Sequence, residues 1–194
     1  MTRGEASAED ASLWDWPPGA EAKPLAALVF EDSEDANRIV AEFAAELARE
    51  GRRVAGVIQR ADATDSCTCR EAELVNVATG DSFSILQNLG GQSDACRIDP
   101  DAIARAGVEI ARSLEDAPEL LFVNRFGKLE CGGEGLTAEI GAAVLAGAPT
   151  LVCVARRFLP QWRDFAGGLA DEIPCCAASL RRWWRAVDAG AAAA

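Results

Sequence analysis

The segment from Asn124 to Leu136 carries the polar residues best suited to holding an anion. It follows a short apolar run and places Lys128, Glu130 and then glycines at 132, 133 and 135 ahead of a helical pattern. Glycines let the backbone approach an anion closely, a lysine neutralises its charge, and a glutamate accepts a donor or a metal. The same residues fit a solvated surface loop with an exposed ion pair. The pattern therefore predicts either an anion site or a solvated surface loop.

Cysteines form a second group that can do chemistry. The chain has seven; Cys67 and Cys69 precede the turn Thr79-Gly80-Asp81, and Cys96 follows it in the same insertion. Three thiolates can hold a soft metal ion, with Cys131 as a fourth ligand, although the Cys-x-Cys spacing suits tetrahedral zinc less well than a gap of about two to four residues. In a reducing compartment most such residues are plain thiols. Plain thiols, a metal site and a redox pair are the three interpretations.

The turn at residues 31–35 is informative because of what it lacks. It reads Glu-Asp-Ser-Glu-Asp, with four acids and no glycine. A loop that cradles phosphates needs glycines for close backbone approach and a Lys-Ser/Thr pair for phosphate and magnesium. Carboxylates here would repel a triphosphate and offset the amides of the following helix. The turn indicates a degenerate Walker A region and argues against ATP hydrolysis by this loop.

Composition excludes several classes of function. The chain contains no histidine, so no Ser/His or Cys/His nucleophile pair can form. A net charge of −12 repels nucleic acid and anionic lipid at long range. No apolar run approaches the ~20 residues of a membrane span, and the N-terminal residues lack the apolar centre of a signal peptide. We expect a cytoplasmic protein that binds neither nucleic acid nor membrane.

The elements that must position these residues alternate between apolar runs and helical patterns. Leu25–Phe30 fits a buried strand, residues 35–50 a helix and residues 53–58 a second strand, which together form a parallel crossover unit. Two alternating stretches around Thr79-Gly80-Asp81 predict an inserted β-hairpin. Further helices are predicted after Pro100 and at 136–146 and 160–173, with strands at 120–123 and 150–154. The prediction is a three-layer α/β domain with a parallel core of four strands.

The sequence divides into three parts. Residues 1–23 are expected to be a flexible lead-in whose Trp14 and Trp16 can dock on the domain. Residues 24–176 form the α/β domain, and 177–194 a helical or disordered tail. In that tail, the segment Arg181-Arg182-Trp183-Trp184-Arg185 either binds a partner, such as a protein, or forms a helix with an aromatic inner face and solvated arginines.

Ligands of open parallel sheets bind beyond the carboxyl ends of the strands, where loops vary and helix amides point. The predicted strands are followed by Glu31, by Gln59 and Arg60, by residues 124–130 and by residues 155–157. A small anion or a nucleotide is therefore expected at this edge. The residues expected to bind it are Gln59, Arg60, Arg97, Asn124, Lys128 and Glu130.

Five short motifs resemble the bacterial family DUF2478 over residues 25–174. They are Val57-Ile58-Gln59-Arg60 with the Cys67/Cys69 pair, Gln87-Asn88-Leu89-Gly90, Ala95-Cys96-Arg97-Ile98-Asp99, Val123-Asn124-Arg125-Phe126-Gly127-Lys128-Leu129-Glu130, and Gly133-Glu134-Gly135-Leu136. The family is similar to THEP1-type nucleoside triphosphatases, so the resemblance implies a P-loop-like fold and adds Gln87 and Asp99 to the ligand-binding residues. It places Asn124 in the Walker B region, where the relatives have an acid. Some members are associated with molybdenum uptake genes, which implies metal or oxyanion handling.

Three functional hypotheses follow. The first is a non-hydrolysing ligand-binding or regulatory domain for a nucleotide or small anion. The second is a nucleoside triphosphatase in which Lys128 and Arg97 replace the missing loop lysine. The third is a metal or redox carrier built on Cys67, Cys69 and Cys96. The cofactor would accordingly be a nucleotide or a thiolate-bound metal ion.

Overall fold

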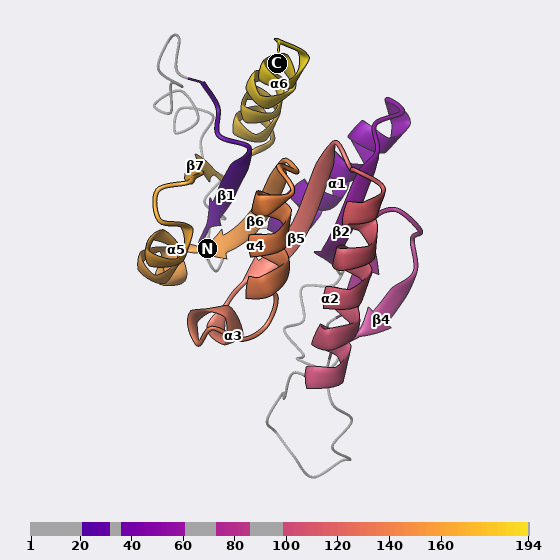
Figure 1. The fold of residues 1–194 in the computed structure, drawn as a ribbon, viewed down its shortest axis with the longest axis vertical. Helices are drawn as coiled ribbons and strands as arrows, with labels where there is room; N and C mark the ends of the chain where they lie inside the picture. Colours follow the sequence, from indigo (N-terminus) through magenta and orange to yellow (C-terminus); the bar gives the residue numbers. More distant parts are fainter. Residues whose placement is uncertain (1–20, 32–35, 61–72, 86–98, 194) are drawn as a thin grey trace, which may run out of the picture.

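The computed structural model describes residues 21–31, 36–60, 73–85 and 99–193. Within these ranges the chain builds one sheet in the strand order β4-β3-β2-β5-β6-β1-β7, shown in Figure 1. The strands are β1 (Leu25–Phe30), β2 (Val54–Gln59), β3 (Glu73–Asn76), β4 (Ser82–Ser84), β5 (Leu120–Phe126), β6 (Thr150–Ala155) and β7 (Ala170–Pro174). The helices are α1 (Ala36–Arg49), α2 (Pro100–Glu115), α3 (Lys128–Cys131), α4 (Thr137–Leu145), α5 (Leu159–Ala166) and α6 (Ala177–Ala193), with a 3-10 turn at Arg156–Phe158.

Helices cover both faces of the sheet, because the central strands are apolar on both sides. One core combines α1 and α6 with strand residues such as Leu28 and Phe122. The other combines α2, α4 and α5 with the alternate strand residues, among them Val123 and Val152. Figure 1 shows α2 and α4 in front of the sheet and α5 at its left side. The predicted three-layer α/β architecture is confirmed.

The hairpin prediction is confirmed as well. β3 pairs antiparallel with β2, and β4 pairs antiparallel with β3, so the insertion extends the sheet beyond β2. Asn76 fixes the turn, because its side-chain oxygen accepts hydrogen bonds from the amides of Ala78 (2.9 Å) and Thr79 (3.3 Å). The observed strands are shorter than the alternating stretches of the sequence.

The prediction of four parallel strands was wrong. β2, β5, β6, β1 and β7 are mutually parallel, so the described sheet has five parallel strands, and β7 begins inside the helix predicted at 160–173. The helix α5 instead ends at Ala166, because the next residue, Gly167, has a left-handed φ of 56°. Pro174 is compatible with β7 because an edge strand has one unpaired side.

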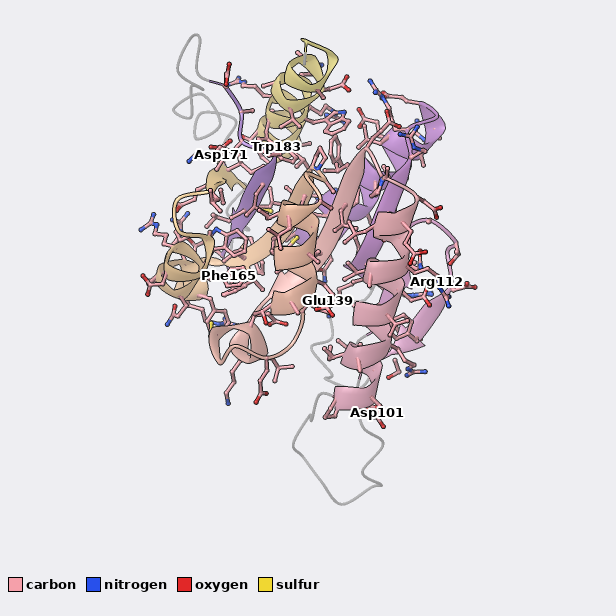
Figure 2. The ribbon with its side chains drawn as sticks, in the orientation of Figure 1. Asp101, Arg112, Glu139, Phe165, Asp171 and Trp183 are labelled. Carbon is pink, nitrogen blue, oxygen red and sulfur yellow. The ribbon has the colours of Figure 1, made fainter. Side chains whose placement is uncertain are left out.

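The C-terminal segment forms a continuous helix that is part of the core. In α6, Trp183 is 0% and Trp184 7% exposed. The Trp183 indole donates to the Lys23 carbonyl oxygen at 3.1 Å, and Arg52 bridges Glu119 (3.0 Å) and Asp188 of α6 (2.6 Å). Figure 2 shows Trp183 between α6 and the sheet. The two tryptophans therefore form the aromatic inner face that was one of the two interpretations of this segment.

Candidate site at the carboxyl edge of the sheet

The site region is the edge where β1, β2, β5 and β6 end. Because these strands are parallel, their last residues, Phe30, Gln59, Phe126 and Ala155, lie along one side of the sheet. The short helix α3 follows β5 directly on this side. This is the edge at which α/β folds bind their ligands.

An irregularity in β5 determines which side chains reach the edge. Pairing of β2 with β5 ends at Val57 and Val123, and the β5–β6 register shifts between Val123 and Phe126. Asn124 and Arg125 thus lie beyond the regular ladder on both sides. Such interruptions redirect side chains and are common beside functional sites.

Arg125 connects the ends of three strands. Its Nη2 donates to Oε1 of Gln59 on β2, and its guanidinium carbon lies 5.4 Å from the ring centroid of Phe30 on β1. Burial raises the pKa of the Cys153 thiol on β6, and the positive charge of Arg125 lowers it in part. A guanidinium held by an amide and an aromatic face is a fixed donor for an anion. The sequence prediction had not included Arg125 among the ligand-binding residues.

Asn124 is the deepest polar residue of the edge. It is 3% exposed, and its Nδ2 donates to Oδ1 of Asn37 on α1 at 2.8 Å. Its Oδ1 is buried without a hydrogen-bond partner among the described residues. A buried carbonyl oxygen without a hydrogen bond costs roughly 1–3 kcal/mol of stability, which a hydrogen bond from a water or a ligand donor would recover. Asn37 was not predicted, because only the tertiary contact distinguishes it from any polar residue in a first helical turn.

Glu130 is engaged with its own loop. It is 8% exposed; its Oε2 accepts from the Gly127 amide at 2.9 Å and its Oε1 from the Leu136 amide at 3.0 Å. Gly135 packs against this carboxylate, since a Cβ there would lie 2.0 Å from Oε1. Gly135 therefore lets the backbone pack closely against the Glu130 carboxylate, and Glu130 closes the loop between α3 and α4.

Lys128 differs from Glu130 because it faces solvent. Its side chain is exposed on α3 and makes no hydrogen bond or ion pair with another described residue. Two further cations follow β6: Arg156 pairs with Glu31, and the Arg157 guanidinium lies 4.9 Å from the Phe158 ring centroid. Basic groups thus follow β5 and β6 on the same edge.

The other predicted residues have different positions. Arg60 pairs with Glu73 of the hairpin at 2.8 Å. Asp99 caps α2, accepting from the Asp101 amide at 3.1 Å. The structure therefore brings Gln59 to Arg125 and Asn124 to Asn37, whereas Arg60 pairs with the hairpin and Asp99 caps its own helix. Gln87 and Arg97 lie outside the described residues.

The cysteine hypothesis is not tested by the described part of the chain. Cys67, Cys69 and Cys96 lie outside it, and within it no group of three or more Cys, Asp or Glu side chains can hold a metal. Burial raises the pKa of the Cys153 thiol to about 12, and burial followed by the charge of Glu130 raises the pKa of Cys131. Of the four cysteines in the described part of the chain, Cys131 and Cys153 are therefore poor thiolate donors.

Residues 32–35 are also outside the described residues, so the degenerate Walker A region stays a prediction from the sequence. At the ends of this turn, Glu31 pairs with Arg156, and Ala36 begins α1 and is buried. Among the described helices, none combines the length and the apolar character needed to cross a bilayer.

A family model described as "Protein of unknown function (DUF2478)" matches residues 25–183. The chain is 32% identical over 162 residues to a Bradyrhizobium diazoefficiens protein named "Molybdenum import ATP-binding protein ModC 2". That match covers 83% of this chain and 18% of the relative, so the chain spans about a fifth of the relative's length.

Two solved structures have a similar fold. THEP1 from the hyperthermophile Aquifex aeolicus aligns with a TM-score of 0.55 and 12% identity, covering 77% of this chain and 88% of that one. A human cancer-related nucleoside triphosphatase aligns with a TM-score of 0.56 and 10% identity, covering 76% and 86%. At these identities the likeness shows the fold alone, and it agrees with the P-loop-like α/β fold expected from the sequence.

Proposed function

The chain belongs to the DUF2478 family, and on that premise we propose that it is a ligand-binding or regulatory domain that holds a nucleotide or small anion without hydrolysing it. The proposed site is the carboxyl edge of the sheet. The observation that carries the proposal is Arg125, a guanidinium fixed between Gln59 and Phe30 where β1, β2 and β5 end. Lys128 supplies a second, solvent-facing cation after the same strand.

The carboxylates at the edge support a role without hydrolysis. Phosphoryl transfer needs groups that hold magnesium and orient the attacking water. From the end of β5 through α3 the described chain offers Asn124, a neutral amide, and Glu130, whose two oxygens each accept a backbone amide. Glu31, after β1, is paired with Arg156. Asn124 is therefore not an acid, and the carboxylates of Glu130 and Glu31 are already occupied by backbone amides or by Arg156.

The relative suggests the context in which such a domain works. Its printed name joins ATP binding with molybdenum import, and the segment like this chain is a minor part of it. We infer that the domain senses a nucleotide or a tetrahedral oxyanion, such as molybdate, on behalf of a transport system. Its acidic surface, with a net charge of −12, agrees with a partner other than nucleic acid or anionic membrane, and we place its action in the cytoplasm.

A second candidate is a nucleoside triphosphatase, and the fold likeness to THEP1 and the human enzyme favours it. In that case Lys128 takes the role of the phosphate-binding lysine. The cysteine-based carrier stays a hypothesis that rests on Cys67, Cys69 and Cys96 in the sequence alone.

Calorimetric titration of the full chain with MgATP, MgADP, phosphate and molybdate tests the proposal. Lys128→Ala should lower the affinity for whichever anion binds by about tenfold or more, because a hydrogen bond to a charged group contributes roughly 1.5–3 kcal/mol. Arg112→Ala is the matched control, since Arg112 is an exposed arginine in the last turn of α2, where its partner is Glu109 at 3.7 Å. Absence of heat with all four ligands would refute the proposal.

A phosphate-release assay with the same proteins separates the two candidates. The proposal expects MgATP to bind without release of phosphate. Release that Lys128→Ala abolishes and Arg112→Ala preserves would instead establish the triphosphatase.

A further inference from the structure

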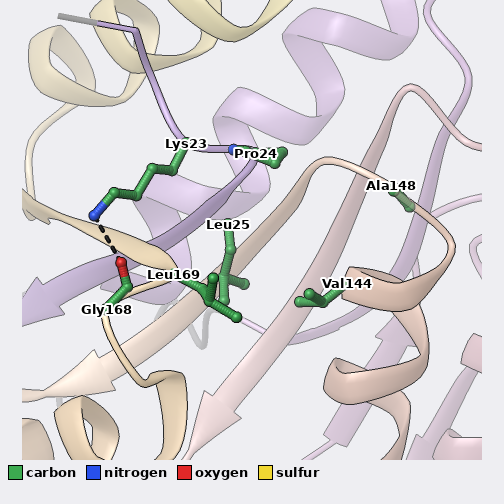
Figure 3. A pocket seen from close by; sticks show the side chains of 8 residues that line it. Lys23, Pro24, Leu25, Val144, Ala148, Gly168 and Leu169 are labelled. Atoms are coloured by element: carbon green, nitrogen blue, oxygen red, sulfur yellow. Dashed lines mark hydrogen bonds between the residues drawn. The ribbon is translucent and has the colours of Figure 1, made fainter.

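A cavity lies at the opposite, amino edge of the sheet. Its volume is about 250 Å³, and it is lined by the start of β1, the end of α4 with the loop that follows, and the turn before β7. Its walls are mostly apolar, with Leu25, Val144 and Leu169 as the largest apolar residues (Figure 3). A cavity of this size holds on the order of eight waters, or one aromatic ring system.

The cavity carries an exposed apolar side chain at its wall. Leu169 lines the cavity and is 60% exposed, which makes it one of the four large hydrophobic side chains that are exposed among the described residues. An exposed apolar residue at an apolar cavity marks a place where another apolar group docks.

The chain enters the domain at this cavity, at a fixed point. Lys23, a lining residue, is held by its amide to Asp171 Oδ2 (2.7 Å), by its Nζ to the Gly168 carbonyl (2.8 Å) and by its own carbonyl to the Trp183 indole (3.1 Å). Figure 3 shows the Lys23–Gly168 bond at the rim. Residues that precede Lys23 therefore start from the cavity itself.

We propose that Trp16, in the segment before Lys23, inserts its indole into this cavity. Trp16 stands seven residues before Lys23, and seven residues reach at most about 25 Å. Pro17 and Pro18 stiffen the chain next to the tryptophan, and Gly19 provides a position at which it can turn back. A tether this short gives the indole an effective concentration near the millimolar range. Docking joins the N-terminal segment to the edge opposite the proposed ligand site, and it does not depend on the proposed function.

The test uses 5-fluorotryptophan in the full chain and ¹⁹F NMR. The chain has five tryptophans, of which Trp162, Trp183 and Trp184 are buried, so Trp14→Phe and Trp16→Phe assign the two remaining signals. The solvent isotope shift between H₂O and D₂O reports how far each indole is exposed. Leu169→Ser removes a cavity wall, and Leu145→Ser makes the same change at an exposed position outside the lining.

Docking predicts a Trp16 signal that is shielded in the wild type, loses its shielding in Leu169→Ser and keeps it in Leu145→Ser. The Trp183 signal serves as the folding control, because its indole bonds to Lys23 from the core side. A solvent-exposed Trp16 in the wild type would overturn the proposal. Shielding that disappears on tenfold dilution would also overturn it, because a second copy would then be the occupant.

Discussion

Replacing Gly135 by alanine tests whether Glu130 is the structural centre of its loop. Gly135 has a φ of 65°, which costs a residue with a Cβ about 1–2 kcal/mol. The new Cβ would also lie 2.0 Å from Glu130 Oε1, so the carboxylate must move and give up its 3.0 Å bond from the Leu136 amide. Loss of a hydrogen bond to a charged group adds roughly 1.5–3 kcal/mol. The free energy of unfolding should fall by about 3 kcal/mol or more.

Gly133 provides the matched control within the same loop. Its φ is 79°, but a Cβ there meets nothing within 4 Å, so Gly133→Ala should lose only the conformational term of about 1–2 kcal/mol. Urea denaturation of both variants measures the difference. In a Glu130→Ala background, the loss caused by Gly135→Ala should shrink toward that of Gly133→Ala, with a remainder from Leu129, whose Cβ would lie 3.1 Å from the new Cβ. Equal losses for the two glycines in the wild-type background would refute the structural role of Glu130.

Three further predictions concern the core, acid stability and thiol reactivity. Trp183→Ala should lower the free energy of unfolding by about 3–5 kcal/mol in urea denaturation, because the side chain is fully buried; a loss below 1 kcal/mol would contradict a core role for α6. The amide of Arg53 and the Arg52 side chain lower the pKa of Glu119, so the stabilisation is present above the unfolded pKa near 4.5 and is lost as pH falls through the folded pKa. Glu119→Gln should flatten the loss of thermal stability with acid in that window, and an unchanged acid profile would contradict the pairing. Cys153, with a pKa of about 12, should resist iodoacetamide at pH 8 in the native protein, as peptide mass spectrometry would show; labelling as fast as in the unfolded chain would contradict its burial.

The strands that the sequence predicted are those with continuous apolar runs. β1, β2, β5 and β6 are buried on both faces, so their sequences identify them without help from tertiary structure. β7 was missed because Ala170–Pro174 contains one fully buried residue, Ile173, and two acids. The glycine pair at 167–168 was the available signal for the break between α5 and β7.

The side chains of the site were predicted less completely than the edge on which they lie. The apolar run at 120–123 predicted β5 and placed Asn124 near its carboxyl end, but the strand continues to Phe126, so Asn124 and Arg125 lie within it and do not follow it. The contact of Arg125 with Gln59 and Phe30 on other strands depends on tertiary packing, and no local pattern encodes it. The bond from the Gly127 amide to Glu130 is different, because a glutamate three residues after the N-cap is the spacing of a capping box and was an available local signal.

The central claim is that the carboxyl edge holds a nucleotide or small anion without hydrolysing it, and its nucleotide form can be tested directly. The direct measurement is a ³¹P NMR spectrum of MgATP with stoichiometric full-length protein, followed over hours. The account predicts broadened or shifted ATP phosphate signals, reduced in the Lys128→Ala protein, with no growth of inorganic phosphate. ATP signals identical to those of free MgATP, or phosphate that accumulates with the wild type and not with Lys128→Ala, would contradict it.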